Sequence, residues 1–258
     1  SWRQQLAVAD ALQGLGSVTG RLQEAIPGVA ESGAGQSLFP LLRRPGIRGS
    51  RRSAQLEMQI GALLDAQVRD GAFPGAVAMV TVGGELVAEV ARGRHSYEVN
   101  SKLVDMQTRY DLASLTKVCA TLPALALLLE KGSMHLDDRL GQWVPGFTGP
   151  AKSELTLRQV AVHGAGVKAW APFYRKLQGK SAIVAAAASQ ALVAPPLSQY
   201  QYSDLGMILL MAAIEQAAQQ PMDEFLGRFV YPHLGVHAVF VAAGQRIAAA
   251  PTERDPWR

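Results

Sequence analysis

The sequence predicts an α+β fold in which a β-hairpin precedes a series of helices. Two apolar, β-branched runs, 75–82 and 85–91, flank Gly83 and Gly84. A two-glycine connection is a strong hairpin signal, because both turn residues can adopt positive φ. From residue 112 onward the apolar residues recur at the spacing of helices. A hairpin followed by a block of helices indicates an α+β architecture and not a doubly wound parallel sheet.

Helices are predicted on both sides of the hairpin. The first begins at Ser53, which we expect to be its N-cap, and stops before Gly71. The segment 112–132 is apolar almost all round, so we expect a buried helix that is kinked at Pro123 and ends at Gly132. Shorter helices are expected at about 153–162, 181–193, 204–218 and 221–230.

Composition divides the chain into an N-terminal extension and linker, residues 1–52, and a main domain, residues 53–258. The net charge of +4 is concentrated in the linker, where five arginines fall within residues 43–52. Such a cluster could bind nucleic acid or anionic lipid, or it could form a solvated linker, and we expect the linker. No nucleic-acid-binding signature accompanies it, so no nucleic-acid partner is predicted.

Cysteine, histidine and hydropathy patterns limit the chemistry further. The single cysteine, Cys119, excludes an internal disulfide framework, and its apolar neighbours predict a small buried residue. His135 and His233 have no partner at metal-ligand spacing, so we expect no metal and no cofactor. No run approaches the roughly 20 apolar residues that span a bilayer, so no transmembrane segment is predicted.

Ser114 and Lys117 form the first motif that carries chemistry. Three residues apart on a helix, their side chains share a face, so the hydroxyl and the amine can meet. The start of a helix places the Ser114 N–H where it can bind an oxyanion. Burial would lower the pKa of Lys117, and a neutral amine could then accept the serine proton. The alternative is a lysine that extends from a helix end towards water.

Tyr202 and Asp204 form the second motif, in a loop that follows Pro195-Pro196 and precedes an apolar helix. The Tyr202 phenol could lie beside Ser114, where a nearby lysine would favour the phenolate. The alternative is purely structural, with Ser203 or Asp204 as the N-cap of the following helix and Tyr202 as a packing residue.

Together, the two motifs resemble the class C β-lactamase and penicillin-binding-protein-like serine hydrolases, which include the family VIII esterases. The resemblance starts near Ser53 and is also carried by 73–76, 110–117, 136–138, 155–160 with His163, and 202–206. It implies a β-lactamase/DD-peptidase-like fold, an antiparallel sheet packed by helices with a helical subdomain. It implies Ser114 as nucleophile, Lys117 as base and Tyr202 as its partner in proton transfer. The substrates implied are esters, β-lactams or D-amino-acid peptides, which react through an acyl-enzyme.

Two departures from the family pattern open an alternative. Asp204, the expected substrate-binding residue, stands where the family usually has Asn. An amide can donate to the acyl carbonyl of the substrate, whereas an ionised carboxylate can only accept. The carboxylate could also pair with Lys117 and weaken it as a base. The family's third motif, Lys/His-x-Gly on a strand, has no counterpart after Tyr202, so we expect a truncated chain with an incomplete sheet and half an oxyanion hole. The alternative function is a non-catalytic binding or regulatory module, or an inactive fragment. The loop His163-Gly164-Ala165-Gly166 stands where the family has His-Thr-Ser-Gly, and we expect it to shape that loop.

Overall fold

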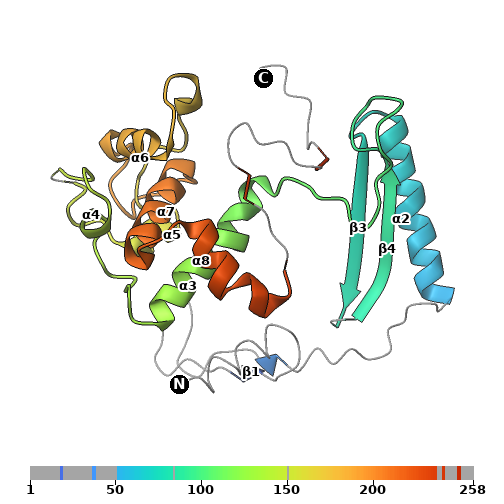
Figure 1. The fold of residues 1–258 in the computed structure, drawn as a ribbon, viewed down its shortest axis with the longest axis horizontal. Helices are drawn as coiled ribbons and strands as arrows, with labels where there is room; N and C mark the ends of the chain where they lie inside the picture. Colours follow the sequence, from blue (N-terminus) through green and yellow to red (C-terminus); the bar gives the residue numbers. More distant parts are fainter. Residues whose placement is uncertain are drawn as a thin grey trace. The chain divides into compact units, whose positions relative to one another are not determined.

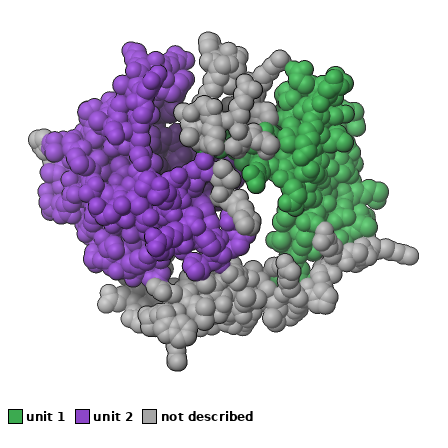
Figure 2. All heavy atoms as spheres, viewed as in Figure 1, with its two compact units in different colours: residues 1–111, 241–258 green, residues 112–240 purple. Residues whose placement is uncertain are grey.

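Two compact units divide the chain, and each is described by itself. The computed structural model describes residues 18–19, 37–38, 51–83, 85–149, 151–236, 240–241 and 249–250 (Figure 1). Unit 1 comprises residues 1–111 and 241–258, and unit 2 comprises residues 112–240 (Figure 2). Most of the arginine cluster, residues 43–50, lies outside the described residues. The predicted division between residues 52 and 53 stays a prediction.

Unit 1 contains the predicted hairpin. Strands β3 (Gly75–Val82) and β4 (Glu85–Gly93) pair antiparallel, with Val82 opposite Glu85 and an irregularity between Val80 and Thr81. Gly83 has φ of +58°, as the turn requires, and Gly84 lies outside the described residues. The hairpin prediction is therefore confirmed. The short strands β1 (Val18–Thr19) and β2 (Ser37–Leu38) also pair antiparallel.

Helix α2 (Arg51–Arg69) covers one face of this hairpin (Figure 1). The prediction that Ser53 is its N-cap is wrong, because the helix begins at Arg51. The Ser53 hydroxyl instead donates to the carbonyl of Val87 at 2.7 Å, so a buried polar side chain fastens the helix to β4. Ala88 and Val90 are buried on the same strand.

Unit 2 is helical, and its core surrounds α7 (Asp204–Ala218), whose bounds match the prediction. Three predicted helices are shorter than expected. One of them, α5, begins only at Leu157, because Thr156 and Gln159 form a capping box that fixes its start. The helices of unit 2 are α3 (Leu122–Glu130), α4 (Leu140–Trp143), α5 (Leu157–Ala161), α6 (Lys180–Ser189), α7 and α8 (Met222–Phe229), with 3₁₀ turns at Phe173–Arg175 and Tyr231–Leu234.

The predicted helix at 112–132 is interrupted. It consists of a 3₁₀ turn (Ala113–Leu115), a π-helical turn (Lys117–Thr121) and α3. Pro123, at the start of α3, has no N–H to donate to the carbonyl of Cys119, and the phenol of Tyr231 donates to that carbonyl at 3.1 Å. The hydrogen-bond pattern therefore changes at Pro123, and the predicted kink there stays a prediction.

Burial of this segment is only partial, and the expected all-round burial is wrong. Ala124, Leu125 and Leu128 lie in the core of unit 2, whereas Leu115 and Val118 are exposed. Cys119 is also exposed, contrary to the prediction. Among the described residues one stretch, Ala113–Glu130, has the length and hydropathy of a membrane span, which is weak evidence because core helices of globular domains meet the same criterion.

Replacing Tyr231 with phenylalanine should lower the free energy of unfolding by about 1 kcal/mol, because the Cys119 carbonyl loses its donor while the aromatic ring is kept. Urea unfolding followed by circular dichroism measures the change. Tyr174 is an exposed tyrosine of the same unit, so Tyr174→Phe is the matched control and should leave stability within error. Equal stability of the two variants would contradict the role given to the Tyr231 hydroxyl.

Candidate active site

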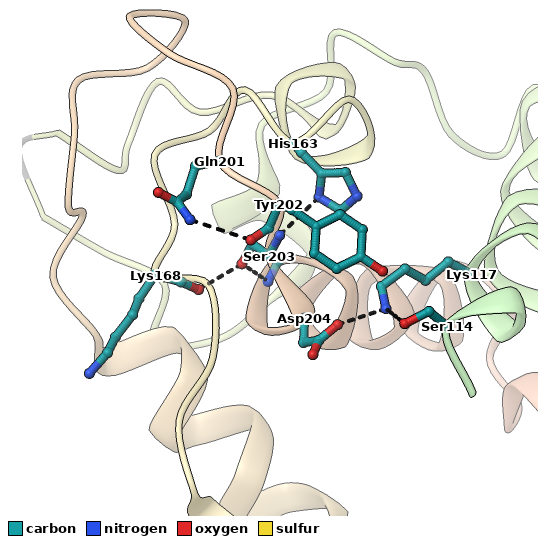
Figure 3. A network of polar contacts seen from close by, with 9 residues as sticks. Ser114, Lys117, His163, Lys168, Gln201, Tyr202, Ser203 and Asp204 are labelled. Atoms are coloured by element: carbon teal, nitrogen blue, oxygen red, sulfur yellow. Dashed lines mark hydrogen bonds and ion pairs between the residues drawn. The ribbon is translucent and has the colours of Figure 1, made fainter. Parts of the chain in front are cut away.

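All four residues predicted from the two motifs meet within unit 2 (Figure 3). Ser114 lies in the exposed 3₁₀ turn, and Lys117 is the first residue of the π-helical turn. Tyr202 lies in the loop before α7, and Asp204 is the first residue of that helix. Tertiary packing has therefore brought together two motifs that lie far apart in the sequence.

Lys117 is the centre of the cluster. Its Nζ donates to Ser114 Oγ at 3.2 Å and lies 2.6 Å from Asp204 Oδ1. The same ammonium lies 4.9 Å from the centroid of the Tyr202 ring. The Lys117 side chain is 16% exposed and that of Asp204 is 42% exposed, so the amine is less accessible to solvent than the carboxylate it contacts. Lys117 is thus bound inside the cluster, which excludes the alternative of a lysine extended towards water.

The charge state of Lys117 differs from the expectation. Burial lowers its pKa, but hydrogen bonds and charge from Asp204 and then Tyr202 outweigh burial, and the net pKa lies above the ordinary lysine value. The amine therefore stays protonated at neutral pH. The expected neutral amine is wrong, because the carboxylate of Asp204 lies so close.

Tyr202 responds in the opposite direction. Hydrogen bonding from Lys117, and then from Ser114, lowers the pKa of its phenol below the ordinary tyrosine value, although burial and Asp204 oppose the change. Tyr202 is 41% exposed, which does not fit the alternative of a packing residue. The phenol oxygen points towards Lys117 and Ser114 in Figure 3. The cluster thus shifts the two pKa values in opposite directions, raising that of Lys117 and lowering that of Tyr202.

Ser203 fixes the start of α7, as the structural alternative proposed. It is the N-cap, and its hydroxyl accepts from the Gly206 N–H at 2.8 Å. The same hydroxyl donates to the carbonyl of Lys168 at 2.7 Å, and the Asp204 N–H donates to the carbonyl of Ala169 at 2.8 Å. Two adjacent residues thus have different roles. Ser203 caps α7, and Asp204 forms the ion pair with Lys117.

The loop 163–166 also contributes to the site, which the motifs alone did not predict. Ser203 N–H donates to Nδ1 of His163 at 3.2 Å, and the His163 ring lies 4.6 Å from the Tyr202 ring between centroids. Gly166 has φ of +67°, and a Cβ there would collide with the carbonyl of Ala194. The second glycine of this loop is therefore required by a close backbone approach. The resemblance in this loop was the only signal in the sequence.

Backbone strain marks Ala113, the residue directly before Ser114. Ala113 has φ of +43°, in the left-handed region that non-glycine residues rarely adopt. Such a conformation costs on the order of 1–2 kcal/mol and persists where the surroundings enforce it.

Among the described residues, no group of three or more His, Cys, Asp or Glu side chains could hold a metal ion.

Comparison with known proteins places the chain among relatives over most of its length. The family model described as Beta-lactamase matches residues 60–257. A protein of Escherichia coli (strain K12) named "Putative D-alanyl-D-alanine carboxypeptidase" is 29% identical over 222 residues, which cover 78% of this chain and 51% of the relative. The chain thus spans about half the length of the curated relatives it matches.

Solved structures share the fold. One, described as "EstCE1, a hydrolase with promiscuous acyltransferase activity", has a TM-score of 0.65 at 22% identity, covering 79% of this chain and 60% of that chain. A class C beta-lactamase has a TM-score of 0.62 at 19% identity, covering 73% of this chain and 51% of that chain. The predicted β-lactamase/DD-peptidase-like α+β fold is thereby confirmed.

Proposed function

This chain belongs to the beta-lactamase family, and from that premise we propose that it is a serine hydrolase with Ser114 as its nucleophile. The observation that carries the proposal is the position of Lys117, whose ammonium contacts Ser114 Oγ while it lowers the pKa of the Tyr202 phenol. One cation thereby orients the nucleophile and prepares a base beside it. The proton acceptor is the Tyr202 phenolate, in place of a neutral Lys117.

In the proposed reaction, every proton that is transferred moves between the substrate, water, Ser114 and Tyr202. Ser114 Oγ attacks the acyl carbonyl carbon of the substrate while its proton moves to the Tyr202 oxygen. The carbonyl oxygen gains negative charge, which the Ser114 backbone N–H is expected to stabilise as one oxyanion donor. The tetrahedral intermediate then expels the leaving group, which takes the proton from Tyr202, and Ser114 keeps the acyl group. A water that loses its proton to Tyr202 attacks the acyl-enzyme, and Ser114 recovers that proton as the acid leaves.

The substrate is proposed to be an ester, a β-lactam or a D-amino-acid peptide. The printed names of the relatives support this range, since they include a carboxypeptidase for D-alanyl-D-alanine, a hydrolase with acyltransferase activity and a beta-lactamase. These substrates share an acyl carbonyl that a serine can attack. Asp204, which carries a charge where the family usually has an amide, argues against a dedicated β-lactamase.

Covalent labelling tests the proposal. The protein is treated with a fluorophosphonate and, separately, with a fluorescent penicillin, and the modified peptide is identified by mass spectrometry. We expect an adduct on Ser114 with at least one probe. The alternative of a non-catalytic binding module, which the Lys117–Asp204 ion pair motivates, predicts saturable binding of a substrate analogue without an adduct. A folded protein that binds but is never labelled would therefore overturn the proposal.

Replacing Asp204 with asparagine should move the pH profile of acylation to lower pH. Asp204 raises the pKa of Lys117 and also opposes the lowering of the Tyr202 pKa, so both values should fall when its charge is removed. Activity requires the phenolate and the ammonium, so it rises through the Tyr202 pKa and falls through the Lys117 pKa. Both limbs should therefore shift in the acid direction. The second-order rate constant of acylation, measured against pH, reports the shift.

The matched control for this change is Asp223→Asn. Asp223 lies in the first turn of α8, as Asp204 lies in the first turn of α7, so the same chemical change is made in the first turn of another helix. The control profile should coincide with that of the wild type. If the Asp204→Asn profile also coincides with it, the carboxylate does not set the charge state of the site.

A further inference from the structure

His163 connects the loop 163–166 to the segment that carries Tyr202. We propose that His163 is a positioning residue, which holds the Tyr202 phenol in the orientation needed beside Ser114. This inference rests on the proposed role of Tyr202 as proton acceptor. It assigns no contact between His163 and substrate, because its polar contact is with the backbone of Ser203.

The imidazole of His163 fixes Tyr202 at two points. Nδ1 accepts a hydrogen bond from the N–H of Ser203, the residue directly after Tyr202, at 3.2 Å. The ring lies against the Tyr202 ring, with centroids 4.6 Å apart and an interplanar angle of 42° (Figure 3). One contact restrains the backbone at the end of Tyr202, and the other restrains the rotation of its side chain.

The contacts with His163 are important because burial alone does not hold the Tyr202 side chain in one orientation. Tyr202 is 41% exposed, so close packing does not enclose its ring. An unrestrained tyrosine side chain would exchange between rotamers and would spend only part of the time beside Lys117. A displacement of about 1 Å at a reacting group can lower a rate by about 10²-fold. A side chain that selects one orientation of Tyr202 would therefore increase the rate without touching the substrate.

The backbone of the loop strengthens the same link. The carbonyl of His163 accepts from the Gln201 N–H at 2.9 Å, so the residues on both sides of Tyr202 are bound to His163. His163 has φ of +59°, a conformation in which glycine would be unstrained. A histidine held there at a conformational cost indicates that its side chain is needed, and its contacts are those with Tyr202, Ser203 and the Tyr200 ring.

Protonation of His163 would remove this link. The observed bond requires a lone pair on Nδ1, which places the proton of the neutral ring on Nε2. The groups that face the ring are Lys117, Asp204, and the rings of Tyr200 and Tyr202. Burial and then the charge of Lys117 lower the pKa of His163, while Asp204 opposes them. The neutral form thus persists below the ordinary histidine value, and positioning is lost as the pH falls through the lowered pKa.

Three substitutions of His163 separate its contributions. His163→Asn keeps an acceptor at the position of Nδ1 and tolerates the positive φ. His163→Phe keeps an aromatic ring but has no hydrogen-bond acceptor. His163→Gly has neither a ring nor an acceptor, and it is included because glycine adopts φ of +59° without strain. Circular dichroism and urea unfolding establish that each variant is folded.

Two readouts are measured on each variant. The first is the rate of Ser114 acylation by a fluorophosphonate as a function of pH. The second is the pKa of the Tyr202 phenol, from ultraviolet difference titration assigned with Tyr202→Phe. We expect His163→Phe and His163→Gly to acylate about 10- to 100-fold more slowly. In both variants the Tyr202 pKa should rise towards its ordinary value, because the phenol leaves Lys117.

His163→Asn should recover most of the rate and keep the lowered Tyr202 pKa, and its profile should lack any inflection due to histidine. Wild-type acylation and a lowered Tyr202 pKa in either His163→Phe or His163→Gly would overturn the inference. Losses of rate in all three variants with the Tyr202 pKa still lowered would also overturn it, since His163 would then affect the rate without positioning the phenol. Absence of any wild-type adduct would refute the proposed function alone, because the Tyr202 titration tests the positioning without turnover.

Discussion

Replacing Tyr202 with phenylalanine is expected to slow acylation of Ser114 by about 10²–10⁴-fold, the usual contribution of a positioned proton acceptor. The substitution keeps the ring against His163 and removes only the phenol oxygen. Ser114 would still be oriented by Lys117, but its proton would lose the phenolate that is its proposed acceptor. The rate of acylation by a chromogenic ester, measured under single-turnover conditions, gives the size of the effect.

The pH dependence distinguishes loss of a base from loss of structure. Lys117 lowers the pKa of Tyr202, so wild-type acylation should rise with pH as the phenol ionises below the ordinary tyrosine value. The Tyr202→Phe variant should lose this rise, and its residual rate should be nearly flat. Tyr200→Phe removes a phenol two residues away while keeping the ring that contacts His163, and should behave as the wild type. A rise that survives in Tyr202→Phe would show that another group is the base.

Replacing Lys117 with methionine is the second change with a large expected effect, a decrease in the acylation rate of about 10³-fold or more. Ser114 loses the donor that orients it, and Tyr202 loses the cation that lowers its pKa. The carboxylate of Asp204, left without its partner, would further disfavour the phenolate. These effects reinforce one another, so the loss should exceed that from Asp204→Asn.

Two comparisons test this interpretation of Lys117. Lys168→Met removes a lysine whose carbonyl contacts Ser203 but whose amine points away from Ser114 in Figure 3, and it should leave acylation unaffected. The double variant Lys117→Met with Asp204→Asn should be no slower than Lys117→Met alone, because the uncompensated carboxylate is removed with the amine. Strictly multiplicative losses in this cycle would argue that Lys117 and Asp204 act independently.

Local patterns predicted the hairpin and the bounds of α7, because a two-glycine turn and a helical period depend on adjacent residues alone. Both sequence motifs also led to the family, which the comparisons confirm. The direction of the Lys117 pKa shift could not be predicted, because it depends on a 2.6 Å contact made across the folded unit. For the same reason the contact of His163 with Ser203 had no signal in the sequence beyond a resemblance. The catalytic roles of Ser114, Lys117 and Tyr202 stay predictions.

The hydrogen bond from Tyr231 to Cys119 has a kinetic consequence. It joins residues 112 positions apart and ends on the turn that carries Lys117. The ion pair between Lys117 and Asp204 joins residues that are also far apart in the sequence. Closing such long loops costs entropy before the contacts repay it, so we expect these contacts to form after the local helices. A reagent that reacts only with the assembled Ser114 cluster would therefore time the completion of the tertiary structure during refolding, whereas far-ultraviolet circular dichroism would follow the earlier growth of the helices.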